Sequence, residues 1–480
     1  MTISFPDEIW RHIFSHFEVV LEDDYRDLEP LDTLTALSLV NRRFYLIAQG
    51  FLYRTLLLWG LNDFYFGDRR ELHVLLATTL ASNPRLGMFT REISLAHGNL
   101  EDGDEPMKSI RNFVPSLNMS QVFKDWLNRE FIFGRKGSGI ASFLLALMPR
   151  VQLVELRFYK EPTTTLPWIL GGWSDGSMGE STNEHGRPHT VSNYLHDLQE
   201  LRVEAGFGQT CIYITYFETI LLHPNLRTLK LSGFDWTEPR IIDMRWQGYP
   251  SNLRQVNLDK CIVDASTVRD VLSRCKGLEV LTITAGSFDL VPHLRPRVWE
   301  IDLYEFGDVL RGLGQKLVMF ELDTYEYRYN GVPRGKIGSL DNLKALRYLS
   351  ISRNDFIGPE DDSGAINGFH LAEVLPTSIE VMDFREDMSE QALGQNEYEY
   401  GRLHDDIYSV LVCGRFPSLR KLELTRLGIP RRDAFNMEVP GWTIKDGAWF
   451  LDVSPDYELF THMELTMERK HDDPGSIDTI

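Results

Sequence analysis

Cysteine is scarce in this chain and shows no paired spacing. The 480 residues contain four, Cys211, Cys261, Cys275 and Cys413, with no Cys-x-x-Cys spacing and no histidine pair beside them. Structural zinc sites and redox motifs need closely spaced ligands, and disulfide scaffolds need many cysteines. The sequence therefore predicts buried free thiols in a reducing compartment, without a metal site or a disulfide framework.

Long apolar runs are also missing. The most apolar stretch, residues 140–148, is far shorter than the roughly 18 residues that a membrane-spanning helix needs. The segment from Met1 to Pro6 lacks the basic start and the apolar core of a signal peptide. We expect an intracellular protein of the cytoplasm, the nucleus or both, with no membrane partner.

Positive charge is in deficit. Lysine and arginine number 50 against 70 aspartates and glutamates, which gives a net charge of −20. An acidic chain repels phosphate backbones, so a nucleic acid is not expected as a partner. Hydrophobic residues make up 43% of the chain and aromatics 11%, which is ample for a large folded core.

Signals for bound nucleotides and metals are weak. No Gly-Lys-Ser/Thr phosphate loop occurs, and Gly137-Ser138-Gly139 lacks the third glycine of a dinucleotide fingerprint. His185 and His189 lie in a glycine-rich stretch with no fixed acid beside them, so a solvated loop explains them better than a metal site. We expect no catalytic residues, no cofactor and no metal, and hence a protein that is not an enzyme.

The most informative stretch is residues 5–56. Pro6 and two following acids favour a helix start, and apolar residues recur at helical spacing over 9–17 and again over 34–40. Asn41 is predicted to cap a third helix that reaches Leu52. Three short helices bury little surface, so this unit is expected to need a partner.

This stretch resembles the F-box motif. Phe5-Pro6, Leu-Val-Asn-Arg-Arg-Phe over 39–44, and Leu-Tyr-Arg over 52–54 occur in the order of that motif. Phenylalanine replaces the usual first leucine, and the acidic loop near 18–31 is longer than usual. F-boxes bind the Skp-type adaptor of cullin-based SCF ubiquitin ligases, so the resemblance implies an adaptor-binding module over residues 1–56. Its docking surface and core would comprise Phe5, Pro6, Ile9, Ile13, Phe14, Leu34, Leu37, Val40 and Phe44.

A short strand pattern, apolar-x-x-apolar-x-apolar, repeats through the rest of the chain. Copies begin at positions 153, 198, 226, 253, 278, 317, 346, 379, 419 and 460, with a shorter one at 93–95. Three central gaps between copies fall within the roughly 20–29 residues of leucine-rich repeats. Helices are predicted between them, at 71–81, 140–148, 213–222, 266–274, 301–313 and 401–412. Residues 99–119, 161–190 and 355–368 are expected to be loops.

Each such unit cannot bury its own strand and helix, so neighbours are expected to stack. The predicted fold is α/β: a three-helix F-box over 1–56, then an irregular leucine-rich-repeat solenoid over 57–470 with a curved parallel sheet and outer helices. Residues 471–480 are predicted to be a disordered tail. A doubly wound Rossmann-type sheet is the alternative. The combination resembles the F-box/leucine-rich-repeat proteins of filamentous fungi.

That resemblance implies a substrate-recognition subunit, which binds the adaptor, and through it a cullin, and presents an unknown protein target for ubiquitination. Aromatic residues, which are enriched at interfaces, are the candidates for holding the target: Trp236, Trp246, Tyr249, Tyr325, Tyr327 and Tyr329. Packing between repeats would explain the same residues. A non-catalytic scaffold outside a ligase, and a hydrolase within a helix–strand fold, are the competing functions.

Overall fold

The computed structural model forms two compact units, one comprising residues 1–233 and 242–253, the other 234–241 and 254–480. Each unit is described by itself. The structure describes residues 5–19, 29–58, 70–97, 104–132, 136–158, 166, 169–170, 194–205, 212–214, 220–221, 223–237, 250–286, 300–325, 333–357, 370–385, 397–428, 439–453 and 459–470.

The first unit begins with helices and continues as a parallel sheet. Its helices are α1 (Asp7–Ser15), α2 (Glu29–Ser38), α3 (Arg42–Leu52), α4 (Arg70–Ser82), α5 (Pro84–Gly87), α6 (Asp104–Phe113), the 3₁₀ turn η1 (Val114–Ser116), α7 (Gln121–Ile132) and α8 (Lys136–Ala146). Its strands are β1 (Thr55–Leu57), β2 (Glu92–His97), β3 (Leu153–Phe158), β4 (Glu200–Ala205), β5 (Ile212–Tyr213) and β6 (Thr228–Ser232). The parallel order β1-β2-β3-β4-β6 follows the chain.

The second unit repeats the strand–helix alternation. Its strands are β7 (Phe234–Asp235), β8 (Gln255–Cys261), β9 (Val280–Ala285), β10 (Met319–Asp323), β11 (Tyr348–Ser352), β12 (Val381–Arg385), β13 (Lys421–Gly428), β14 (Trp442–Val453) and β15 (Leu459–Arg469). Its helices are α10 (Ala265–Arg274), α11 (Leu303–Leu313), α12 (Arg353–Ile357), α13 (Leu371–Val374) and α14 (Glu397–Val412). Strands β8 to β13 pair in parallel and in chain order.

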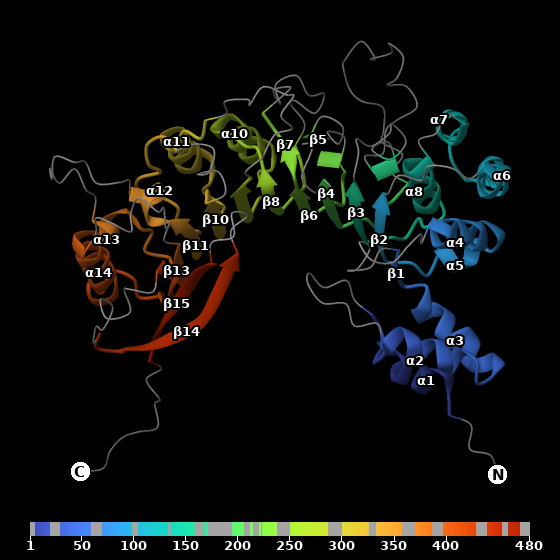
Figure 1. Ribbon diagram of the computed structural model, residues 1–480, viewed down its shortest axis with the longest axis horizontal. Helices are drawn as coiled ribbons and strands as arrows, with labels where there is room; N and C mark the ends of the chain where they lie inside the picture. Colours follow the sequence, from blue (N-terminus) through green and yellow to red (C-terminus); the bar gives the residue numbers. More distant parts are fainter. Residues whose placement is uncertain are drawn as a thin grey trace. The chain divides into compact units, whose positions relative to one another are not determined.

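The strands bury one face and leave the other partly open. In β4 and β9 half-buried and buried residues alternate strictly, because successive side chains point to opposite sides of a strand. The buried positions carry the apolar residues of the predicted pattern, such as Leu281, Ile283 and Phe320. In the second unit α10, α11 and α14 lie on one side of the sheet (Figure 1), and two of their apolar residues, Phe306 and Ile407, are fully buried.

Sequential strand order and one-sided burial decide between the two predicted architectures. A doubly wound sheet reverses its strand order and has helices on both faces, whereas the parallel strands of each unit here pair in chain order. A helix-facing core with a polar opposite face is what a stacked array produces. The fold is therefore a mixed α/β, solenoid-like one with mostly parallel sheets.

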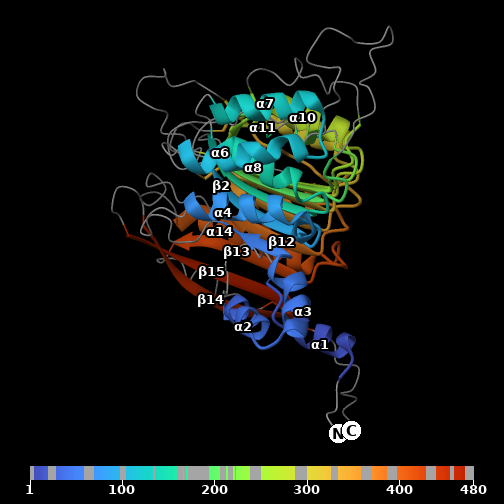
Figure 2. The same ribbon diagram turned by 90° about the vertical axis from the view of Figure 1, so that its right-hand side faces the viewer.

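The last predicted repeat is wrong in direction. The strand at 460–465 lies within β15, which pairs antiparallel with both β13 and β14. Figure 2 shows β13, β15 and β14 side by side at one end of this sheet. A hairpin needs only a short connection and no covering helix, so the array ends here in two long strands rather than in another strand–helix unit.

Other expectations from the sequence also need correction. The expected loop at 99–119 contains α6 and η1, and the one at 355–368 overlaps α12. Of the thiols in the described residues Cys261 and Cys275 are buried but Cys413 is exposed. The expected helix at 213–222 lies largely outside the described residues, and Tyr213 itself belongs to β5. The predicted tail at 471–480 lies outside them as well.

One buried histidine couples the folding of the first unit to pH. His223 is only 2% exposed, its Nε2 lies 3.1 Å from the carbonyl oxygen of Leu195, and its Nδ1 accepts the N–H of Asn225. Because Nδ1 accepts, the neutral ring donates from Nε2. Burial, partly opposed by the Leu195 carbonyl and reinforced by the nearby His196, lowers the pKa of His223 to about 4.

We expect acid to weaken this unit through His223. The folded pKa lies below the ordinary value near 6.5, so between those values the unfolded chain binds a proton that the folded chain excludes. The stabilisation is complete above pH 6.5 and is lost as the pH falls toward 4, by about 3 kcal/mol in total. The difference in thermal unfolding midpoint between the parent and His223→Gln should therefore shrink as the pH is lowered from 7.5 to 5. Gln199→Ala, which changes an exposed side chain that does not titrate, should keep a constant difference. A constant difference for His223→Gln as well would contradict this role.

Candidate functional site

The three helices α1, α2 and α3 enclose a small core of aromatic and aliphatic side chains. Phe14 and Leu34 are fully buried, and Ile47 is 7% exposed. Phe44 of α3 joins this core, with its ring 4.5 Å from that of Trp10 and 5.4 Å from that of Phe14. Aromatic contacts at these separations stabilise by more than their buried area. The core thus holds α1 against α3.

Polar contacts fix the ends of the same helices. The Asn41 side chain accepts the backbone N–H of Phe44 at 2.9 Å and caps α3, as the sequence predicted. Arg43 donates to the Asp7 carboxylate at 2.6 Å and to the carbonyl oxygen of Phe5. The basic residue that follows the cap therefore ties α3 to the start of α1.

Seven large apolar side chains of this helical unit are left exposed. On α1 and just before it, Phe5, Ile9 and Ile13 follow one another at four-residue spacing and are 51%, 45% and 39% exposed. At the turn between α2 and α3, Leu39 is 81% exposed and Val40 63%. The first turns of α3 add Tyr45 and Leu46. We call the set Phe5, Pro6, Ile9, Ile13, Leu39 and Val40 the docking face.

The residues predicted to bind an adaptor divide into two groups. Phe5, Pro6, Ile9, Ile13 and Val40 are exposed and belong to the docking face. The others form the core or pack against it: Phe14, Leu34, Leu37 and Phe44. The first group is accessible to a partner, and the second group holds the helices that carry it, with Leu37 and Phe44 only partly buried.

The sequence prediction missed the most exposed apolar side chain of the docking face. Leu39 lies beside Val40 in the matched motif, but helical spacing cannot assign it because α2 ends at Ser38 and α3 begins at Arg42. Residues of a turn follow no helical face, and their exposure depends on how the two helices cross. A leucine directly before the capped helix is the one available signal.

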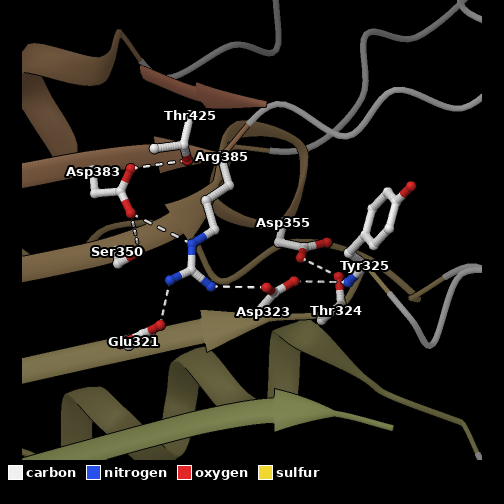
Figure 3. Close-up of polar contacts among 9 residues, drawn as sticks. All are labelled: Glu321, Asp323, Thr324, Tyr325, Ser350, Asp355, Asp383, Arg385 and Thr425. Carbon is white, nitrogen blue, oxygen red and sulfur yellow. Dashed lines mark hydrogen bonds and ion pairs between the residues drawn. The ribbon is translucent and has the colours of Figure 1, made fainter. Parts of the chain in front are cut away.

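A second candidate site lies on the polar face of the sheet in the second unit, where Asp323 and Asp383 are 7% and 6% exposed. Arg385 of β12 donates to Asp323 at 2.8 Å and to Asp383 at 3.4 Å, and it forms an ion pair with Glu321 of β10 (Figure 3). Its side chain is only 17% exposed. We call these four residues the Arg385 cluster.

Hydroxyl groups on neighbouring strands complete the cluster. The Asp383 carboxylate accepts from Ser350 at 2.7 Å and from Thr425 at 3.1 Å, so one carboxylate links β11, β12 and β13. At the end of β10 the backbone N–H of Tyr325 donates to Asp323 at 3.0 Å, as Figure 3 shows. The polar face is therefore an ordered network that crosses several repeats.

The cluster holds more negative than positive charge. Burial alone lowers the pKa of Arg385, but the carboxylates of Asp323, Glu321 and Asp383 outweigh it and raise that pKa well above its usual value. Burial and the carboxylates of Asp383 and Glu321 raise the pKa of the neighbouring Tyr348 to about 12. The guanidinium thus remains charged at any pH at which the protein is folded.

The aromatic residues predicted to bind a target have mixed outcomes. Trp236 is 1% exposed, so this part of the prediction is wrong: the side chain fills the core and offers no surface. Tyr325 is half-buried at the end of β10, beside the Arg385 cluster. The remaining candidates, Trp246, Tyr249, Tyr327 and Tyr329, lie outside the described residues.

Comparisons with known proteins supply no family. No protein-family model matches the sequence, and no curated protein matches it significantly. Within the part of the chain that the structure describes, no group of three or more histidine, cysteine or acidic side chains could hold a metal ion. No helix among the described residues has the length and apolar character to cross a bilayer.

Residues 172–176, Gly-Trp-Ser-Asp-Gly, match the pattern of a hydrolase nucleophile turn but lie outside the described residues.

Removal of the Arg385 charge should destabilise the second unit. Arg385→Met keeps most of the side-chain volume and leaves three poorly solvated carboxylates without their counter-ion, at a cost of about 3 kcal/mol. Unpaired carboxylates have raised pKa values in the folded state, so the deficit should shrink as the pH is lowered from 7.5 to 5.

Urea-induced unfolding at the two pH values measures this effect. Arg420→Met is the matched control, because Arg420 is 72% exposed and forms only a long ion pair with Glu380 at 3.8 Å. It should leave stability nearly unchanged. An Arg385 variant as stable as this control, or a deficit that does not depend on pH, would contradict the role given to Arg385.

Proposed function

We propose that this chain is the substrate-recognition subunit of an SCF-type ubiquitin ligase. The observation that carries the proposal is the docking face on α1–α3. Large apolar side chains that stay exposed together on a small helical unit mark interaction surfaces, since solvent contact stabilises none of them. The F-box resemblance of the same residues names the occupant as a Skp-type adaptor, and through it a cullin.

The division between core and surface supports an adaptor interaction. Phe14, Leu34 and Phe44 hold the helices together without the help of a partner, so Ile9, Leu39 and Val40 are free to contact another protein. Each apolar side chain that is buried on association contributes about 1.5–3 kcal/mol before the entropic cost of binding. A few such side chains at the centre of an interface suffice for specific binding.

The solenoid-like remainder supports a binding role rather than catalysis. Stacked strand–helix units present extended surfaces to protein ligands, and the open sheet face of the second unit carries the ordered Arg385 cluster with Tyr348 and Tyr325 around it. In this proposal the target contacts that face. The chain then acts by holding the target near the ubiquitin-conjugating enzyme, which raises the local concentration of the reactants.

The docking face can be tested with a matched pair of leucines. Leu39 and Leu75 are both exposed, at 81% and 63%, but Leu75 lies on α4, outside the docking face. Leu39→Asp should weaken binding of a purified Skp-type adaptor by at least about tenfold, because it places a charge in an apolar interface. Leu75→Asp should bind like the parent chain. Calorimetric titration of each full-length variant with the adaptor measures the difference.

Ile9→Asp and Val40→Asp extend the test over the rest of the docking face. Both positions are exposed, so the fold should be retained, and circular dichroism checks this. Adaptor binding at parental strength by all three docking-face variants would overturn the proposed interface. Adaptor binding without recruitment of a cullin would favour the scaffold function instead.

A further inference from the structure

The first unit contains a pocket whose described lining carries N–H donors and no acid. It measures about 450 Å³ and is lined by Lys108, Arg111 and Asn112 of α6 and by Asn128 of α7. The three residues of α6 are spaced i, i+3 and i+4, which places them on one face of the helix. Two positive charges and two side-chain amides therefore converge on one cavity.

The walls of this pocket are held by a packed core. Ile110, on the opposite side of α6 from Lys108, is fully buried, as is Leu127, which precedes Asn128 on α7. The turn η1 joins the two helices, and its Val114 is also fully buried. The donors thus project from anchored helices.

Three of the four lining residues have no competing partner among the residues that the structure describes. Arg111, Asn112 and Asn128 make no side-chain hydrogen bond or ion pair with any residue that the structure describes. Other arginines of the same unit are engaged: Arg157 pairs with Glu204 at 2.5 Å, and Arg202 with Glu200 at 2.7 Å. Arg111 therefore has its guanidinium available to a ligand.

The charge of the pocket selects the class of ligand. A phosphate monoester carries about −1.5 to −2 charges at pH 7 and three strong acceptor oxygens, which matches one lysine and one arginine. Guanidinium groups bind phosphate through two parallel hydrogen bonds, and amides add neutral donors. A nucleic acid or an anionic membrane is disfavoured because the acidic chain as a whole repels an extended polyanion.

We propose that the pocket lined by Lys108, Arg111, Asn112 and Asn128 binds a phosphate monoester. Its volume lies in the range of small-molecule sites and exceeds what one phosphate group fills, so it has room for the group that bears the phosphate. That group is a phosphorylated side chain of a protein or a free phosphorylated metabolite. This site does not depend on the docking face or on the ligase function.

Calorimetric titration of the full-length protein with three probes tests the proposal: inorganic phosphate, capped phosphoserine and a sugar phosphate. We expect saturable binding of inorganic phosphate in the millimolar range, weakened by salt. Tighter binding of capped phosphoserine assigns the site to a protein ligand, and tighter binding of the sugar phosphate assigns it to a metabolite. No saturable binding of any probe below about 10 mM would overturn the proposal.

Two variants and a control locate the binding. Arg111→Gln, which removes the charge and keeps the length, should weaken binding by about tenfold, and Asn112→Asp should weaken it at least as much. Both positions are exposed, so folding should be unaffected. Arg129→Gln removes the same charge from α7 at a residue that does not line the pocket and should change affinity by less than about twofold. Equal losses in Arg111→Gln and Arg129→Gln would place the phosphate elsewhere and refute the site.

Discussion

One-sided burial of a parallel sheet is the constraint on which the rest of the structure depends. Parallel strands are usually covered by helices on both faces, but in strands such as β4 and β9 alternate residues stay only half-buried, on the face opposite the buried apolar residues. The open positions must tolerate water and also pack against like positions on the adjacent strands. Where carboxylates fall next to one another there, as in Glu321, Asp323 and Asp383, a single cation has to neutralise them. Arg385 is a structural necessity of an open parallel face before it is a candidate for binding.

The same constraint explains what could be predicted. The repeated apolar pattern marks the residues of the buried face. The positions of strands such as β9 and β10 and of helices such as α10 and α11 could therefore be predicted from the sequence. The direction of β15 could not, because alternation of apolar residues is the same in a parallel and in an antiparallel strand. Trp236 shows a related limit. Tryptophan is common both at interfaces and in cores, and only the packing shows which of the two a given tryptophan belongs to.

In the helical unit, neighbouring residues that differ in burial show what the sequence pattern cannot predict. Ile13 and Phe14 are adjacent, equally apolar and both at helical spacing, yet one is 39% exposed and the other fully buried. Periodicity finds the helix, but the crossing of α1 and α3 decides which apolar residues face inward. Leu39 lies between α2 and α3, so helical periodicity does not apply to it. The sequence pattern therefore predicts the existence of an apolar surface, but it is less reliable in predicting which residues compose that surface.

The two candidate binding surfaces of the first unit differ in physical character, and this difference makes them separable. In the proposed interactions the docking face acts through apolar area, which salt screens little, whereas the pocket on α6 and α7 acts through charge, which salt screens strongly. The −20 net charge acts on them unequally. It opposes self-association through the exposed leucines, and it opposes any long polyanion that approaches the cationic pocket. A compact dianion in the pocket interacts more strongly with the local arginine and lysine than with distant acidic residues, because salt screens interactions beyond about 10 Å. Net acidity and an anion site are therefore compatible, and together they restrict the ligand to a small, doubly charged group.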